Sequence, residues 1–297
     1  MPLVLLGALI ISFAPIFVRL LPLPPTVIGF YRMAFGLGVL FLWSVALRQR
    51  IRWSARSSLL ALAAGVFFAL DVIFWHRSIN LIGPGLATLL ANCQVFFVTF
   101  FGLLILREKP SPRLWLAIPC AVLGLLMVVG PSLNNNTQAQ AGVGLGALAA
   151  MSYAAYLLVL REAEKARPPI HDSVFSPVMF WATLGSLMLL LIVSGFEQVS
   201  LQVSEPLHWV LLIGYGVLVQ GLAWVLISKG LPRVPISQGG LLLLLQPALA
   251  LVWDVLFFHR PISPREIAGA LLTLAAIYLG SQSQPAKTAS VKFQAMP

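Results

Sequence analysis

Residues 2–47 read PLVLLGALIISFAPIFVRLLPLPPTVIGFYRMAFGLGVLFLWSVAL, two apolar runs separated by a short proline-rich segment. The runs cover roughly residues 3–21 and 25–47, and each is close to the ~20 residues that an α-helix needs to cross a bilayer. No regular helix continues through Pro22-Leu23-Pro24-Pro25, because proline lacks an amide hydrogen and clashes with the preceding turn. The stretch therefore predicts two membrane-spanning helices joined by a tight turn.

The same pattern continues along the chain. Of the 297 residues, 59% are hydrophobic and 9% are charged, against roughly 25% charged in an ordinary soluble domain. This composition excludes a soluble single domain and leaves no length for a sizeable domain outside the membrane. We expect an all-α integral membrane protein with ten transmembrane helices. The predicted spans cover approximately residues 3–21, 25–47, 57–79, 84–106, 112–130, 142–160, 173–194, 207–228, 235–258 and 264–281.

The basic residues predict the orientation of these spans. The chain has 19 Lys and Arg residues and a net charge of +10, and a cytoplasmic N-terminus places most of the basic residues in cytoplasmic loops, as the positive-inside rule requires. The outer set is only Arg19, Arg77, Arg260 and Arg265. Both termini are therefore predicted to be cytoplasmic. The inner set is Arg48, Arg50, Arg52, Arg56, Arg107, Lys109, Arg113, Arg161, Lys165, Arg167, Lys229, Arg233, Lys287 and Lys292.

Weak self-similarity predicts two homologous halves. At an offset of 152 residues, Ser111-Pro112-Arg113 falls on Ser263-Pro264-Arg265 and Gln94 falls on Gln246. Five spans in each half force the second half to enter the membrane from the opposite side, so the repeats are expected to be inverted. The predicted units are a first repeat at 1–130, an outer linker at 131–141, a second repeat at 142–281 and a cytoplasmic tail at 282–297.

Three segments carry a family likeness: Ser12-Phe13-Ala14-Pro15-Ile16-Phe17-Val18-Arg19, then Phe30-Tyr31-Arg32, then Leu106-Arg107-Glu108-Lys109-Pro110. In their order along the chain they resemble the drug/metabolite transporter superfamily, and specifically its EamA-like branch. The resemblance implies ten helices in two inverted repeats around a central cavity, and export of small metabolites by alternating access. It also implies that spans three, four, eight and nine form much of the cavity wall. Glu108 has no counterpart in the second half, where Phe258-His259-Arg260 stands instead.

Polar residues inside the spans are the candidates for the substrate site, because an ionisable group in a bilayer faces a bundle interior or a wet cavity. Phe68, Asp71, Trp75 and Ser78 share one helical face of span three. Asp71 with Trp75 is either a site for an amine or a proton with an aromatic wall, or a carboxylate fixed to a neighbouring helix. His76 lies about 140° around the helix from Asp71, and is either a proton relay or a structural residue at the membrane boundary.

Spans four and nine contribute further polar candidates. Thr88 and Asn92 belong to a polar stripe in span four, which either lines a cavity or joins helices by hydrogen bonds. Gln94 lies off this stripe and pairs with Gln246 in the repeat. Gln246 precedes Pro247, whose missing amide leaves a backbone carbonyl open to a substrate.

Spans six and eight bring aromatic candidates. Gln220 and Trp224 are four residues apart in span eight, and Tyr153 and Tyr156 lie in span six. Such faces serve either in helix packing or in binding an apolar, aromatic or cationic amine substrate, the last by cation–π attraction. Arg32 in span two and Asp254 in span nine are expected to have structural roles, with their partners left open.

Several functions are excluded by what the sequence lacks. There is no G-x-x-x-x-G-K-[ST] nucleotide motif and no H-E-x-x-H motif, so the chain alone is not predicted to be an ATP-driven pump, an enzyme or a cofactor-binding protein. We expect a secondary transporter or facilitator that exports small metabolites, amino acids or related amines, across the inner (cytoplasmic) membrane. Its expected partners are a small-molecule substrate, the lipid bilayer and, as a candidate coupling ion, the proton, with no nucleic acid. The expected state is a monomer or weak homodimer, and the alternative function is a membrane enzyme or scaffold acting on lipid.

Overall fold

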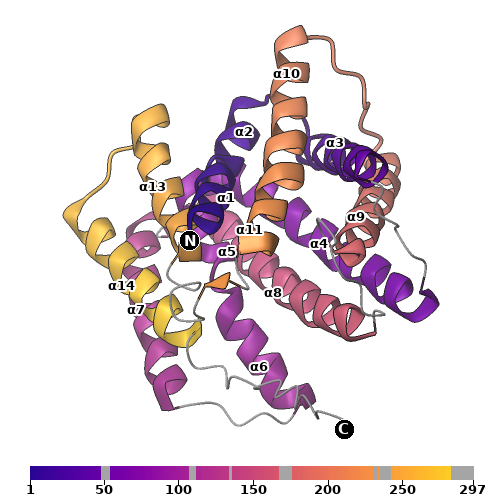
Figure 1. The fold of residues 1–297 in the computed structure, drawn as a ribbon. Helices are drawn as coiled ribbons and strands as arrows, with labels where there is room; N and C mark the ends of the chain where they lie inside the picture. Colours follow the sequence, from indigo (N-terminus) through magenta and orange to yellow (C-terminus); the bar gives the residue numbers. More distant parts are fainter. Residues whose placement is uncertain are drawn as a thin grey trace, which may run out of the picture.

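The computed structural model describes residues 1–47, 54–106, 112–133, 136–166, 176–230, 233–234 and 242–281, and these contain helices and no strand (Figure 1). Glu108, the start of predicted span nine at 235–241 and the tail at 282–297 lie outside the described residues. The helices are α1 (Pro2–Ser12), α2 (Ala14–Leu20), α3 (Pro25–Ala46), α4 (Ala55–Ile82), α5 (Pro84–Ala91), α6 (Gln94–Leu106), α7 (Pro112–Leu133), α8 (Thr137–Lys165), α9 (Pro177–Phe196), α10 (Pro206–Gly214), the π-helix η1 (Tyr215–Ala223), α11 (Trp224–Gly230), α13 (Leu245–Phe258) and α14 (Pro264–Ser281).

The chain is a multi-pass membrane protein by the length and composition of these helices. Within the described ranges, seven helical stretches are long and apolar enough to cross a membrane. Three of them, Pro2–Leu20, Pro84–Phe101 and Pro206–Gly230, each join two or more of the helices named above, and two further apolar helices, Trp115–Gly130 and Leu245–Phe258, are shorter. Helix α8 extends beyond the predicted 142–160 at both ends. It begins early because the Asn136 side chain caps it, accepting a hydrogen bond from the Ala139 amide at 3.0 Å.

Three of the predicted spans are interrupted helices. The first divides at Phe13, two residues before Pro15. The fourth divides at Asn92 and Cys93, between α5 and α6. The eighth runs from α10 through nine residues of π-helix into α11. Hydropathy does not reveal these interruptions, because the apolar residues continue across them.

Packing brings together helices from the two ends of the chain. Helix α4 packs along α8 and α9, α3 packs against η1 and α9, and α7 packs along α14 (Figure 1). Helix α1 contacts α11 and α13, and α5 contacts α13. The pairs α1 with α11 and α5 with α13 both contribute residues to the wall of a cavity.

Helix α3 approaches η1 closely because both present glycine. A Cβ atom built on Gly36 would lie 2.6 Å from the Cβ atom of Gln220, and one built on Gly216 would lie 2.5 Å from the Cβ atom of Phe35. Real Cβ atoms do not approach other atoms this closely. The two glycines therefore allow the contact between these helices.

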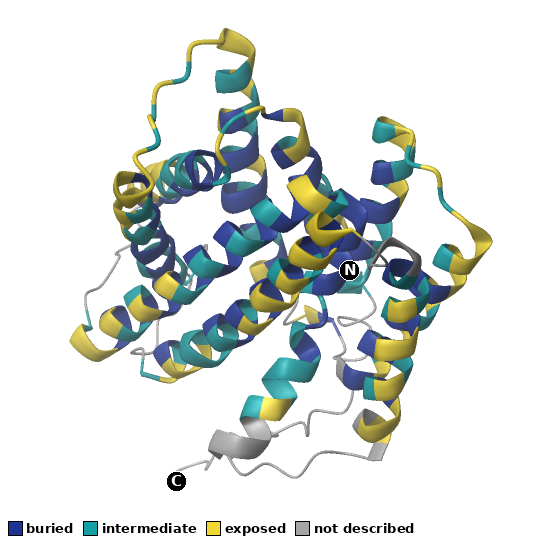
Figure 2. Cartoon of the chain, turned by 180° about the vertical axis from the view of Figure 1, so that it is seen from behind, coloured by how far each residue is buried: buried dark blue, intermediate teal, exposed yellow. Residues whose placement is uncertain are grey.

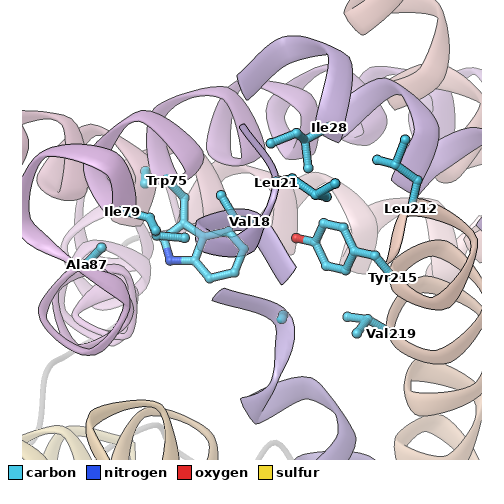
Figure 3. Packing of buried hydrophobic residues seen from close by; sticks show 11 residues of the cluster. Val18, Leu21, Ile28, Trp75, Ile79, Ala87, Leu212, Tyr215 and Val219 are labelled. Atoms are coloured by element: carbon cyan, nitrogen blue, oxygen red, sulfur yellow. The ribbon is translucent and has the colours of Figure 1, made fainter. Parts of the chain in front are cut away.

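Exposed residues lie along the outer faces of the helices (Figure 2), and many of them are large apolar side chains. Leu42, Trp115 and Phe196 are 64%, 63% and 83% exposed. An exposed apolar surface of this extent is typical of helices that face lipid. Inside, Trp75, Tyr215 and Val18 belong to a cluster that joins α2, α3, α4 and η1 (Figure 3).

Candidate functional site

A cavity of about 320 Å³ lies among helices from both halves of the chain. This volume is at the lower end of the range for small-molecule sites. Eight of the eleven side chains that the sequence nominated line it, together with others that it did not nominate. The lining residues are Ile11, Pro15, Arg32, Phe68, Asp71, Trp75, Thr88, Ala91, Asn92, Gln94, Tyr153, Leu157, Trp224, Ile227, Leu243 and Gln246.

Asp71 supplies the carboxylate of this cavity. It lies midway along α4 and is only 7% exposed, yet no hydrogen bond or ion pair joins it to another described residue. The Asp71 oxygens have no partner among the described residues but are not fully enclosed by protein. The carboxylate is therefore accessible from the cavity that Asp71 lines. A carboxylate in this position can accept hydrogen bonds from an ammonium group or take up a proton.

Aromatic rings surround this carboxylate. Phe68 and Trp75 flank Asp71 on α4, and Tyr153 and Trp224 enter from α8 and α11. The Phe68 ring lies 6.2 Å from the Tyr153 ring and 6.5 Å from the Trp224 ring, measured between centroids. The Nε1 atoms of both tryptophans are buried without a hydrogen-bond partner among the described residues, so these residues present ring surface to the cavity in this conformation. Such surfaces suit an apolar or cationic group.

The division between α5 and α6 lies beside the cavity and contributes two amide side chains, Asn92 and Gln94. Asn92 is the C-cap residue of α5, and its Nδ2 donates to the Thr88 carbonyl oxygen at 2.9 Å, while the Thr88 hydroxyl donates to the Pro84 carbonyl oxygen at 2.7 Å. Gln94 begins α6 and lines the cavity, although its spacing had placed it off the polar stripe. Gln246 reaches the cavity from α13.

Arg32 is the second charged residue of the lining. It is 5% exposed, and its Nε donates to Oε1 of Gln220 at 3.2 Å while its Nη1 donates to the Tyr215 hydroxyl at 3.0 Å. Its guanidinium carbon lies 5.0 Å from the Tyr215 ring centroid and 5.5 Å from that of Phe68. Sequence reasoning expected only a structural role for Arg32. The structure also places Arg32 at the cavity. The feature of the sequence that could have indicated this is its charge deep within a membrane span.

Three nominated residues, His76, Tyr156 and Gln220, do not appear in the lining. His76 is fully buried, with Nδ1 3.0 Å from the Pro25 carbonyl oxygen and Nε2 3.0 Å from the Tyr215 hydroxyl. Because a carbonyl oxygen can only accept, Nδ1 carries the hydrogen. Gln220 bonds Arg32, and the Tyr156 ring stacks on Phe68 at 4.8 Å.

Ser78, expected on the same face as Asp71, instead donates to the Gly142 carbonyl oxygen at 2.8 Å and joins α4 to α8. Asp254 is 2% exposed, and its Oδ2 accepts a hydrogen bond from the Gly85 amide at 3.1 Å and lies 3.5 Å from Nη1 of Arg260. It therefore holds the start of α5 against α13.

Comparisons with known proteins agree with this architecture. A model of the EamA-like transporter family matches residues 1–130 and 140–282. The chain is 26% identical to the threonine/homoserine exporter RhtA of Escherichia coli (strain K12), over 89% of this chain and 84% of that protein. It is 24% identical to an uncharacterized transporter of Archaeoglobus fulgidus, over 93% and 94% of the two chains.

Two further comparisons cover only half of the chain or support only the fold. The pseudopaline exporter CntI of Pseudomonas aeruginosa (strain PAO1) is 31% identical, over 52% of each chain. A solved structure that covers 95% of this chain and 97% of its own superimposes with a TM-score of 0.65 at 15% identity. That structure supports the fold alone.

Proposed function

Since the chain belongs to the EamA-like transporter family, we propose that it is a secondary transporter that exports an amino acid or related amine by alternating access through the cavity at Asp71. Family membership favours transport over the lipid-enzyme alternative. The relatives RhtA and CntI bear the names of exporters of threonine and homoserine and of pseudopaline, and this supports a small metabolite as the cargo here.

The observation that carries the proposal is the Asp71 carboxylate. It is more than nine-tenths buried, opens to a cavity and has no partner among the described residues. Burying an unpaired ionised group is costly, so a site of this kind persists where a ligand supplies the partner. An ammonium group supplies both the opposite charge and hydrogen-bond donors, and the neighbouring aromatic rings favour it further.

The pairing of helices supports two inverted repeats of five spans. If the halves are related by a two-fold axis, span one must pack on span eight as span six packs on span three. The structure has both pairs, α1 with α11 and α8 with α4. Spans two and seven (α3, α9), four and nine (α5, α13), and five and ten (α7, α14) each pack on their own counterpart. This is the pattern that two-fold symmetry requires.

Proton coupling is part of the proposal, with Asp71 as the site that alternates between proton and substrate. His76 faces Tyr215 rather than the cavity, so its coupling role would be indirect. Flux driven by an imposed pH gradient should be lost in Asp71→Asn and reduced in His76→Gln. Unchanged gradient-driven flux in both variants would remove the proton from the mechanism.

The proposed location is the inner (cytoplasmic) membrane. In the proposed orientation, both termini lie in the cytoplasm. The distribution of basic residues supports it. Single cysteines placed at Ser200 and at Ala55, in a background without native cysteines, should react with an impermeant maleimide from outside and inside respectively. The reverse pattern would overturn the orientation.

Counterflow in proteoliposomes tests the function. Vesicles preloaded with unlabelled amino acids, polyamines or sugar phosphates are given the corresponding labelled compound outside. We expect exchange with an amine-bearing class, abolished in Asp71→Asn and retained in Ser194→Ala, whose hydroxyl donates to Leu191 within α9. Absence of exchange with every class, in folded protein, would contradict the proposal.

A further inference from the structure

We infer that Arg32 binds an anionic group of the transported molecule, a carboxylate, and that Tyr215 and Gln220 are positioning residues that hold its guanidinium at the cavity. The inference rests on the proposed function, because it takes the cavity as the transport site. It makes Arg32 a determinant of specificity rather than a structural residue.

Arg32 has no charged group bonded to it among the described residues. The side chain is 5% exposed and lines the cavity, and its hydrogen bonds from Nε and Nη1 go to the neutral groups of Gln220 and Tyr215. Its Nη2 has no hydrogen bond to a described residue, and no ion pair joins Arg32 to Asp71. A buried cation whose hydrogen bonds go only to neutral acceptors has no directly bonded counter-ion, and a ligand carboxylate in the cavity would supply one.

The winding of η1 supports the same inference. Tyr215 and Gln220 are five residues apart, which in an α-helix would place them about 140° apart around the axis. In a π-helix, where hydrogen bonds join residues i and i+5, the two lie one above the other. The nine-residue π-helix therefore brings both side chains to the same guanidinium. The pair Gly36 and Gly216 lets α3 come close enough for Arg32 to reach them.

Each acceptor is itself oriented by a further residue. Nε2 of His76 accepts the Tyr215 hydroxyl hydrogen, because Nδ1 donates to the Pro25 carbonyl oxygen. The lone pairs of the Tyr215 oxygen are thereby left for Arg32. The Gln220 amide donates through Nε2 to the Thr183 hydroxyl at 3.3 Å, which directs its oxygen to Arg32.

This assembly gives the cavity two charged groups of opposite sign, Arg32 and Asp71, that are not bonded to one another. A ligand with both an ammonium and a carboxylate group can engage both. An amine that lacks the carboxylate can engage only Asp71. The cavity should therefore prefer amino acids over the amines derived from them by loss of the carboxylate.

The test is counterflow of three labelled amino acids, each competed by itself and by its decarboxylated amine. The pairs are homoserine with 3-aminopropan-1-ol, ornithine with putrescine, and phenylalanine with phenethylamine. We expect the wild type to prefer the amino acid in at least one pair by about tenfold or more, as for one charge-assisted hydrogen bond. Arg32→Gln should abolish that preference.

Two milder variants keep the test decisive if Arg32→Gln folds poorly. Gln220→Glu places a carboxylate against Arg32 with little change in side-chain volume and should abolish the preference. Tyr215→Phe removes one of the two bonds that hold Arg32 and should reduce the preference several-fold. The matched control is Tyr31→Phe, which removes a hydroxyl that donates to the Leu201 carbonyl oxygen at 2.7 Å, and should leave the preference unchanged.

The outcomes separate the inference from the proposed function. A wild type that exchanges amines as well as amino acids would overturn the inference and leave the transporter proposal standing. A preference that survives in Arg32→Gln or Gln220→Glu would also overturn it. A wild type that exchanges none of the six compounds would overturn the proposed function and the inference with it.

Discussion

Replacing Asp71 with asparagine is expected to stabilise the folded protein while it abolishes transport. The carboxylate is 7% exposed and has no hydrogen bond or ion pair to a described residue. A buried polar group left unpaired costs about 1–3 kcal/mol, and more when it is charged. Asparagine occupies nearly the same volume but is itself polar, so Asp71→Asn should recover only the extra cost of the charge. That extra cost is about 2 kcal/mol, the difference between about 3–5 kcal/mol for an unpaired buried charge and about 1–3 kcal/mol for an unpaired neutral polar group.

The measurement is the apparent melting temperature of the purified protein in one detergent at one scan rate, since unfolding of large proteins is often irreversible. At about 2 °C per kcal/mol for a chain of this length, the expected rise is about 4 °C. Counterflow on the same preparation should show no exchange. This combination identifies a residue retained for function at the expense of stability.

Asp254 is the matched control, because it is also buried, at 2% exposed, but is paired. Its Oδ2 accepts the Gly85 amide hydrogen and lies 3.5 Å from Nη1 of Arg260. Asp254→Asn weakens a charged acceptor and leaves Arg260 without its partner there, so we expect a fall in melting temperature of about 2–6 °C. A fall with Asp71→Asn as large as that with Asp254→Asn would refute the claim that Asp71 is unpaired for function.

Two further substitutions test the packing around the cavity. Gly36→Ala forces a Cβ atom to within 2.6 Å of the Gln220 Cβ atom, so it should destabilise the protein by about 1–3 kcal/mol in a thermal melt. The control is Gly38→Ala, where a Cβ atom would meet no other atom within 4 Å and no such loss is expected. Equal losses of stability in the two variants would contradict the close contact at Gly36. Ser12→Ala removes the acceptor of the Trp253 indole hydrogen bond, which is 2.9 Å long and joins α1 to α13, and should cost about 1 kcal/mol. Ser12→Thr, which keeps the hydroxyl, should restore most of that stability, and a melt unchanged in Ser12→Ala would show that the bond contributes nothing.

Much of the candidate site could be predicted from the helical period alone. Phe68, Asp71 and Trp75 share a face because residues three and four apart stack along a helix, and the cavity takes up that face. His76 was expected on another surface for the same reason, and it does face Tyr215. Such predictions need only a continuous α-helix, which α4 provides over Ala55–Ile82.

The breaks within the membrane-spanning helices could not be predicted from the sequence pattern. Gln94 was placed off the polar stripe of its span because the stripe assumed one unbroken helix over 84–106. The chain instead ends α5 at Ala91 and begins α6 at Gln94, and the change of phase brings Gln94 to the cavity. Hydropathy averaged over the span does not reveal such a break, since Asn92 and Gln94 lie among apolar residues on both sides.

The sequence by itself determined that this is a multi-pass helical membrane protein, because apolar runs and charge are local properties. Three short segments in order along the chain also carried its resemblance to the EamA-like transporter family. Only the tertiary structure decided what Arg32 contacts. Its partners, Tyr215 and Gln220, lie more than 180 residues away in the chain, and they meet only because a π-helix aligns residues five apart. No local pattern records that alignment. It follows from how α3 and η1 pack.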